Sequence, residues 1–212
     1  MTEENKLFDL KVLEVKNTLP EVKLPREVDP RLPTVPGLQL FIARCRSGKS
    51  NMLMNFLFGE NFWGGKENIF DVIYYVSPTC RMDKSTQLLF REDLQDKVIV
   101  YEDMDNVDAF IKNIMDYQES FPVNDPKNPR PLVCIVIDDA SGSNACGRSG
   151  VITHLATRFR HYNINIIYSN QNIRGLPSVV RAMADSVFLA KTTSIMERQK
   201  IMEEYNDIYA NK

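Results

Sequence analysis

The fold of this chain is decided by residues 38–58, which read LQLFIARCRSGKSNMLMNFLF. A short apolar run of strand type leads into the polar segment 43–50, and a second apolar run at helical spacing follows. Four residues separate the small residue Ala43 from Gly48-Lys49-Ser50, which is the spacing of a phosphate-binding P-loop between a strand and a helix. Backbone N–H groups bind phosphate at the helix N-terminus of such a loop. We therefore expect a nucleotide site here.

Each residue of this loop has its own expected role. Gly48 lets the backbone approach the anion, Lys49 places an ammonium group against the β and γ phosphates of ATP, and the Ser50 hydroxyl can ligate Mg²⁺. Ala43 stands where glycine is commonest, so it must keep a negative φ or carry some strain. The expected phosphate-binding residues are Ala43, Arg44, Cys45, Arg46, Ser47, Gly48, Lys49, Ser50 and Asn51.

Two further strand patterns end in polar residues. The most apolar one, residues 132–140 (LVCIVIDDA), ends in Asp138 and Asp139. We expect Asp138 to hold Mg²⁺ through water and Asp139 to orient and deprotonate the attacking water. The alternative is that the two aspartates only close a strand. Residues 164–171 end in Gln171, whose amide is placed to sense the γ phosphate, the alternative being a solvated strand end.

Along the chain, strand patterns alternate with helix patterns. Because the strands read as continuous apolar runs, we predict an α/β fold with a mostly parallel central sheet covered by helices on both faces. Ser194 and Glu197 form a predicted capping box at the start of the last helix. The strand patterns cover residues 71–79, 97–103, 132–140, 164–171 and 186–192, and the later helix patterns cover 106–120, 150–162, 176–184 and 194–209.

The predicted organisation is one catalytic core with additions at both ends. Residues 1–37 are an N-terminal arm and a Pro-rich connector, 38–193 are the core, and 194–212 are a C-terminal helix. The arm at 1–17 is either an edge strand or a docking segment. Prolines at 20, 25, 30, 33 and 36 exclude a helix or a central strand, so we expect an extended connector on the surface. The polar residues 140–149 are expected to form a loop beside the site.

Composition limits the class of protein. The 26 Lys and Arg residues against 28 Asp and Glu give a net charge of -2, so any contact with DNA must be local. The 4 cysteines show no CxxC spacing, which favours a reduced intracellular chain without zinc. The N-terminus MTEENK lacks the features of a signal peptide, and no apolar run reaches membrane-spanning length. We expect a soluble intracellular protein with no membrane span.

Several classes of P-loop protein can be compared with these patterns. At least one strand lies between the P-loop strand and the Asp138 strand, the layout of ATPases that activate water directly. No Asn-Lys-x-Asp motif supports a GTPase, and no LSGGQ-like signature supports a transporter ATPase. A nucleotide or small-molecule kinase would need a lid with arginines, for which Arg148 is the only candidate. A nucleotide-binding structural protein with little turnover is the third possibility, supported by Ala43 and Asp139.

Four segments together resemble a known family. IARCRSGKS, VCIVIDDAS, TRFRHYNINIIYSNQ and LPSVVRAMAD are similar to the poxvirus-type genome-packaging ATPases, the viral branch of the FtsK/HerA superfamily of P-loop NTPases found in large DNA viruses and virophages. The resemblance covers residues 38 to 193. Its discriminating feature is Arg160-His161 before the strand that ends in Gln171, followed by a Leu-Pro-x-x-x-Arg segment. The departures are Ala43, Arg46, and Asp139 where relatives often have glutamate, a longer side chain.

The resemblance implies a RecA-like fold and a homo-oligomeric ring that uses ATP and Mg²⁺. The implied work is translocation of viral double-stranded DNA into a preformed capsid, with capsid or portal/vertex proteins as partners. The implied location is the viral factory in the host cytoplasm, and the virion.

The resemblance also favours Arg160 as the residue that reaches the γ phosphate of a neighbouring subunit. The alternative is that Arg158 and Arg160 are both solvated, with Arg181 the next candidate. On a helix, Arg158 and Arg160 would lie about 200° apart, so at most one would face the nucleotide edge.

Overall fold

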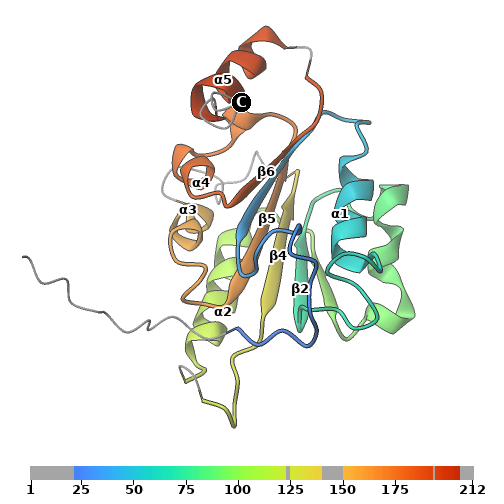
Figure 1. Ribbon diagram of the computed structural model, residues 1–212, viewed down its shortest axis with the longest axis vertical. Coiled ribbons are helices and arrows are strands. Elements are labelled where there is room, and N and C mark those ends of the chain that lie inside the picture. Colours follow the sequence, from blue (N-terminus) through green and yellow to red (C-terminus); the bar gives the residue numbers. More distant parts are fainter. Residues whose placement is uncertain (1–21, 123–124, 140–149, 193, 206–212) are drawn as a thin grey trace, which may run out of the picture.

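The computed structural model describes residues 22–122, 125–139, 150–192 and 194–205. The segments predicted as an arm at 1–17 and as a loop at 140–149 with Arg148, and the end of the last predicted helix, lie outside these residues. The described strands form one sheet in the order β3-β2-β4-β5-β1-β6, and all their pairings are parallel (Figure 1). The strands are β1 (Leu38–Ile42), β2 (Val72–Val76), β3 (Val98–Tyr101), β4 (Val133–Asp138), β5 (Ile164–Asn170) and β6 (Ser186–Leu189).

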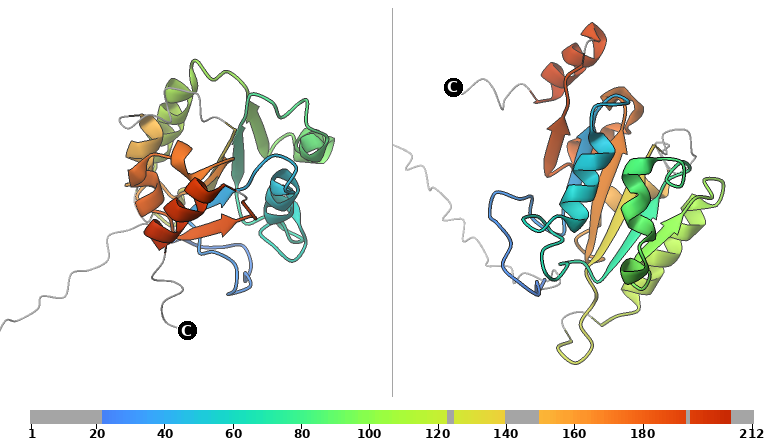
Figure 2. Two further views of the ribbon diagram at one scale, coloured as in Figure 1. Left: turned by 90° about the horizontal axis from the view of Figure 1, so that it is seen from above. Right: turned by 90° about the vertical axis from the view of Figure 1, so that its right-hand side faces the viewer.

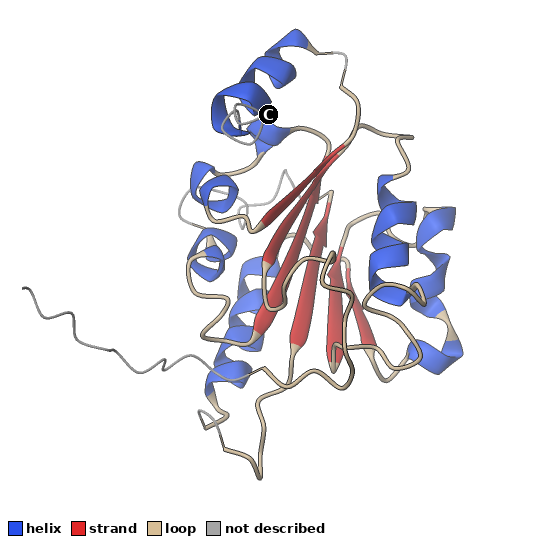
Figure 3. Cartoon of the chain, in the orientation of Figure 1, coloured by secondary structure: helices blue, strands red, loops and turns tan. Residues whose placement is uncertain are grey.

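Helices cover both faces of the sheet, as predicted (Figures 1 and 3). Two separate views place α2, α3 and α4 on one face, and α1 with η1 on the other (Figure 2). Since both faces of the central strands β1, β4 and β5 are buried, these strands need apolar residues on both sides, which explains their continuous apolar runs. The helices are α1 (Lys49–Phe58), α2 (Val107–Glu119), α3 (Val151–Ala156), α4 (Ser178–Ala182) and α5 (Ile195–Tyr205), with 3-10 helices η1 (Lys84–Phe90), η2 (Glu92–Leu94) and η4 (Ile173–Gly175).

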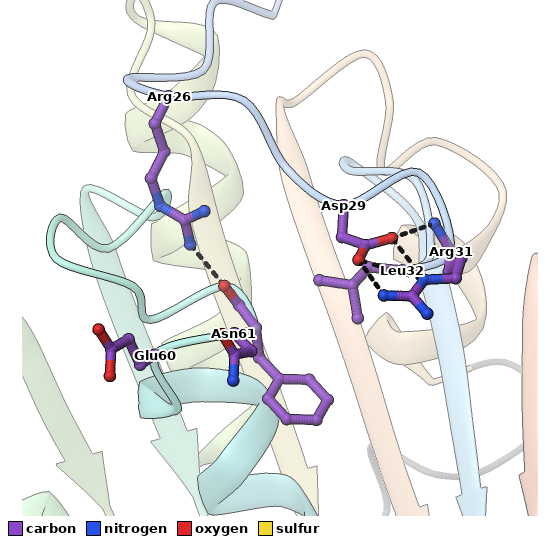
Figure 4. Close-up of a pocket in the computed structure, with 7 residues that line it drawn as sticks. Arg26, Asp29, Arg31, Leu32, Glu60 and Asn61 are labelled. Carbon is purple, nitrogen blue, oxygen red and sulfur yellow. Dashed lines mark hydrogen bonds and ion pairs between the residues drawn. The ribbon is translucent and has the colours of Figure 1, made fainter.

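The Pro-rich connector contributes to the core rather than only lying on it. Leu24, Leu32 and Val35 are partly buried against the aromatic cluster under α1. Arg26 donates hydrogen bonds to carbonyl oxygens of the turn that follows α1, and Figure 4 shows its side chain pointing to that turn. The prolines prevent helix formation, but the apolar residues between them still gain from leaving water. The connector is therefore fixed to the domain.

A pair of buried amides joins β1 to β5. The Gln39 side chain donates to Asn165 Oδ1 over 3.2 Å, and the Asn165 amide donates back to Gln39 Oε1 over 2.9 Å. Asn165 Oδ1 also accepts the N–H of Gly37 at 2.9 Å, just before β1 begins. Both side chains are fully buried, so they need these partners to offset desolvation. The P-loop strand is thus joined to its neighbour by side chains as well as by backbone.

The helix predicted over residues 150–162 is shorter than expected. α3 ends at Ala156, and the chain continues in turns whose N–H groups bond carbonyls three residues back, as in His161 to Arg158 at 2.9 Å. Asn163, with φ 55°, closes these turns before β5. The angular argument about Arg158 and Arg160 therefore fails, because neither arginine lies on an α-helix.

The last helix begins as predicted but uses its capping residues differently. Ser194 Oγ accepts the N–H of Glu197 at 3.3 Å, which is the cap. The Glu197 carboxylate instead accepts the N–H of Ile173 at 2.9 Å, so the reciprocal half of a capping box is replaced by a tertiary contact. No described residue of α5 is buried. None of the described helices is both long and apolar enough to cross a membrane.

Candidate nucleotide-binding site

The P-loop connects the end of β1 to the start of α1. The Ala43 N–H donates to the carbonyl of Asn170 at 3.0 Å, so the first residue of the loop is hydrogen-bonded to the last residue of β5. Positive φ values occur at Arg46 (61°) and Gly48 (86°), and Ala43 is not among the described residues with positive φ. Ala43 therefore satisfies the expectation from its sequence position. Arg46 adopts the left-handed conformation instead, although this conformation is less favourable for a residue with a side chain than for glycine.

Lys49 is held between the two aspartates. Its ammonium nitrogen lies 3.0 Å from Asp139 Oδ1 and 3.3 Å from Asp138 Oδ1. The Lys49 side chain is only 8% exposed, and an ammonium group at that depth needs charged partners to offset its lost hydration. The structure thus brings the P-loop lysine and both predicted aspartates to one place.

Two neighbouring strands hold Asp138. The Tyr75 hydroxyl donates to Asp138 Oδ2 at 2.8 Å from β2, and the Ser169 hydroxyl donates to Oδ1 at 2.5 Å from β5. Burial, and then the nearby charge of Asp138, raise the pKa of Tyr75 well above its usual range, so its hydroxyl keeps its proton. Neither residue was predicted from the sequence to belong to the site. Ser169 lies opposite Asp138 in the β4–β5 register, so the pairing of these strands would have identified it.

Asp139 directly follows β4 in a left-handed conformation, with φ 53°. The Gln171 amide nitrogen lies 3.5 Å from its Oδ1, beside the contact with Lys49. Aspartate is several-fold enriched in this region of φ and ψ, because its short side chain bonds locally, whereas longer side chains are not. The backbone gives a physical reason for aspartate here rather than the glutamate of the resembling family.

A third carboxylate, Asp83, approaches the site from the segment after β2. It caps η1, with Oδ1 accepting the Ser85 N–H at 2.9 Å and the Ser85 hydroxyl at 2.6 Å. The bonds from Ser85 lower the pKa of Asp83 and keep it ionised, and the nearby Ser50 hydroxyl contributes to the same shift. Asp83 therefore lies near the hydroxyl expected to ligate Mg²⁺. The sequence signal that was overlooked is Asp-x-Ser, which favours an Asx turn.

The predicted arginines lie elsewhere. Arg160 is ion-paired with Asp185 at 2.7 Å, and both residues come just before the amino ends of β5 and β6, at the sheet edge opposite the P-loop. Arg181 is ion-paired with Glu204 at 2.7 Å. The structure brings neither arginine to the P-loop of its own chain. Arg174, exposed on η4, is the arginine that follows Gln171 at the carboxyl edge.

The site suits a magnesium nucleotide better than a metal ion alone. Ser50 and Asp138 offer hard oxygen ligands of the kind that Mg²⁺ prefers. Within the described ranges, no group of three or more His, Cys, Asp or Glu residues could hold a metal ion. A Mg²⁺ ion would therefore need phosphate oxygens to complete its ligands, as in P-loop enzymes.

Solved structures with the same fold are known. The DNA-packaging ATPase B204 from Sulfolobus Turreted Icosahedral Virus aligns with a TM-score of 0.60 at 17% identity, covering 81% of this chain and 83% of that chain. B204 from Sulfolobus turreted icosahedral virus 2 in complex with ATP-gammaS aligns with a TM-score of 0.55, at the same identity and coverage. The cytoplasmic domain of EssC gives 0.59 at 13% identity, covering 79% of this chain and 35% of that chain.

At these identities the alignments concern the fold alone, which is that of P-loop NTPases. No family model matches the sequence, and no curated protein matches it either.

Proposed function

We propose that this chain is an ATP-driven motor that translocates viral double-stranded DNA into a preformed capsid. The observation that carries the proposal is the meeting of Lys49, Asp138, Asp139 and Gln171 at the carboxyl edge of a sheet in which β5 separates β1 from β4. Open α/β sheets bind ligands at this edge. The resemblance to the viral branch of the FtsK/HerA superfamily, and the likeness of fold to B204, support the choice of cargo.

The side chains divide the work of ATP hydrolysis. The P-loop N–H groups and Lys49 would neutralise charge on the phosphates, and Asp139 with Gln171 would orient the attacking water. Ser50 and Asp138 would hold Mg²⁺, which when bound neutralises charge between the β and γ phosphates. Lys49 is shared between two carboxylates, so phosphate oxygens must compete with them for its ammonium group. A triphosphate that draws Lys49 away also frees Asp139.

Two other functions use the same loop. A kinase must protect the transferred phosphoryl group from water, whereas Asp139 here carries a carboxylate that is 34% exposed, with Gln171 beside it. This favours hydrolysis over transfer. A structural protein that binds nucleotide with little turnover would be consistent with the Lys49 ion pairs, and only a rate can separate it from a motor.

The proposed function also includes an assembly, docking partners and a location in the infected cell. A homo-oligomeric ring, capsid or portal/vertex proteins as docking partners, and action in the viral factory of the host cytoplasm and in the virion all follow from the resemblance. With a net charge of -2, the chain would need a ring to concentrate local basic groups around the DNA.

Steady-state ATP hydrolysis by the full chain, with and without double-stranded DNA, tests the proposal. A motor should hydrolyse ATP in Mg²⁺ and be stimulated several-fold by DNA, and Lys49→Ala should abolish both rates while the protein stays folded. A rate of ATP hydrolysis that DNA does not change, together with phosphoryl transfer to a small acceptor, would indicate a kinase. Tight ATP binding without turnover would indicate the structural role.

A further inference from the structure

A cavity of about 150 Å³ opens beside the P-loop, between α1 and the end of the sheet. Its two ends differ in character. Its polar lining consists of the loop residues Ser47, Gly48 and Lys49, and its apolar lining comes from the end of β1 with Ala43, from Met52 of α1, and from the end of the edge strand β6 with Ala190. The apolar residues are Phe41, Ile42, Ala43, Met52, Phe188, Leu189 and Ala190.

The apolar end has a fixed floor and accessible walls. Phe188 stacks on Phe41 with ring centroids 4.5 Å apart, which holds both rings in place. Met52 and Leu189 are each 39% exposed, although both are large apolar residues. Concave apolar surface of this kind is typical of a small-molecule site rather than of ordinary protein surface.

The occupant can be deduced from the position of Met52. Met52 follows Lys49 by three residues on α1, so the two side chains are neighbours on one helix face. A ligand whose phosphates lie at Lys49 would therefore place its next bulky group against Met52. A flat aromatic ring suits these walls, because the methionine sulfur makes favourable contacts with aromatic rings.

The apolar end offers little to distinguish one base from another. Among the described residues that line it, none carries a carboxylate, amide or hydroxyl side chain at the end away from the loop. A site that reads hydrogen-bonding groups can reject the wrong ligand by about 10⁴-fold or more, whereas apolar packing alone gives only about 10 to 200-fold. The side chains of these walls would therefore favour a flat ring without distinguishing one base from another.

We infer that this cavity is the nucleobase subsite, and that it accepts the ribonucleoside triphosphates of all four bases with little discrimination. The inference rests on the proposed function, because it takes the P-loop as the triphosphate site. It changes the expected substrate from ATP alone to this wider class.

The first test compares ATP, GTP, CTP and UTP in steady-state hydrolysis by the full chain, with inorganic tripolyphosphate as a ligand without a base. We expect KM values within about tenfold of one another and equal kcat, since contacts far from the reacting phosphate affect ground state and transition state alike. Tripolyphosphate should bind more weakly than any of the four. A preference for ATP above a hundredfold would overturn the inference while leaving the ATPase proposal intact. If no nucleotide binds at all, both fail.

The second test moves the cavity wall. Met52→Ala should raise KM for all four nucleotides several-fold, leave kcat and tripolyphosphate affinity unchanged, and be rescued by Met52→Leu. Met202→Ala is the matched control, because Met202 is 51% exposed on α5 and lies outside the cavity. If Met52→Ala weakened the binding of tripolyphosphate and of nucleotides equally, the side chain would support the phosphate loop rather than contact the base. The subsite assignment would then be wrong.

Discussion

At the scale of single residues, Asp139 combines a special backbone with a special contact. Its φ of 53° suits aspartate and asparagine, and its carboxylate lies between Lys49 and Gln171. We expect Asp139→Asn to keep the fold and ATP binding and to block hydrolysis, because the amide cannot accept a proton from water. Asp139→Glu restores a carboxylate but should lower the free energy of unfolding by about 1 kcal/mol, from backbone strain. Denaturant unfolding and ATP turnover measure both effects.

Asp138→Asn serves as the companion to Asp139→Asn. It should weaken the binding of Mg²⁺ rather than the activation of water, because Asp138 is expected to hold the metal. Its carboxylate is positioned for this by Tyr75 and Ser169. If Asp139→Asn hydrolyses ATP normally, another group orients the water, and Gln171 is the first to test.

A substitution at Asp83 can distinguish the effect of its charge from the effect of its helix cap. Asparagine is as good an N-cap as aspartate, so Asp83→Asn should still accept the Ser85 N–H and leave the unfolding free energy unchanged. The lost charge beside Ser50 should raise the Mg²⁺ concentration for half-maximal hydrolysis several-fold. Asp103→Asn is the control, because Asp103 caps a similar turn before α2. An unchanged Mg²⁺ titration would limit Asp83 to capping.

Thiol reactivity gives a direct probe of the P-loop. Burial raises the pKa of Cys80 to about 11 and that of Cys134 to about 12, so both stay protonated and unreactive near neutral pH. Cys45 is exposed within the loop. In a Cys146→Ser background, we expect an alkylating reagent to label Cys45 alone and ATP to slow the reaction. Labelling at the same rate under saturating ATP would place the nucleotide elsewhere.

At the scale of elements, α5 has few buried contacts, so its N-cap should matter for its stability. None of its described residues is buried, and Ser194 caps its start. Ser194→Ala should cost about 1 kcal/mol of local stability. Hydrogen exchange should therefore speed up over residues 195–205 by about fivefold, with little change in the strands. Ser120→Ala, just beyond α2, is the control. Equal acceleration in β4 would mean that α5 and the core unfold together.

The strands and the amphipathic helix α2 were predictable because their patterns are regular. Val133–Asp138 is buried throughout, and α2 buries Val107, Ile111 and Ile114 at helical spacing. The segment from 157 to 162 was wrongly predicted as helix, because its turns place residues such as Phe159 inside at spacings that resemble helix. η1 and η2 carry no periodic pattern, so nothing in their sequence marks them as helical.

At the scale of the whole molecule, the residues that gather at the ends of the strands were predictable from the sequence. The side-chain contacts between neighbouring segments were not. Parallel strands bring their carboxyl ends to one edge, so the meeting of Asp139 with Gln171 near Lys49 follows from the order of elements. Tyr75 and Asp83 could not be found in this way, because their roles depend on side chains that cross between neighbouring segments. The place of Arg160 depends on a loop whose path the sequence does not reveal.

The proposed role of Arg160 between subunits can be tested by mixing variants. Arg160→Ala should leave ATP affinity nearly unchanged and, if Arg160 reaches a neighbour, reduce turnover of the assembly by about 10³-fold or more. Adding Asp139→Asn protein should then restore some turnover. The lost ion pair with Asp185 is largely exposed on the Arg160 side and should cost about 1 kcal/mol or less.

Arg174→Ala is the comparison for that experiment, because Arg174 is exposed at the carboxyl edge. Wild-type turnover by Arg160→Ala together with a loss in Arg174→Ala would transfer the role to Arg174.

The buried amide pair between Gln39 and Asn165 has a mechanical consequence. In the proposed motor, a pull on DNA would load the strands in shear, and parallel strands joined by backbone alone could slip by two residues, about 7 Å, and pair again. Here such a slip would leave two buried amides without partners, at a cost of about 1 to 3 kcal/mol each. The pair therefore opposes sliding between the strand that leads into the P-loop and the strand that leads to Gln171, and under the proposed function it would keep these two strands in register while force is transmitted.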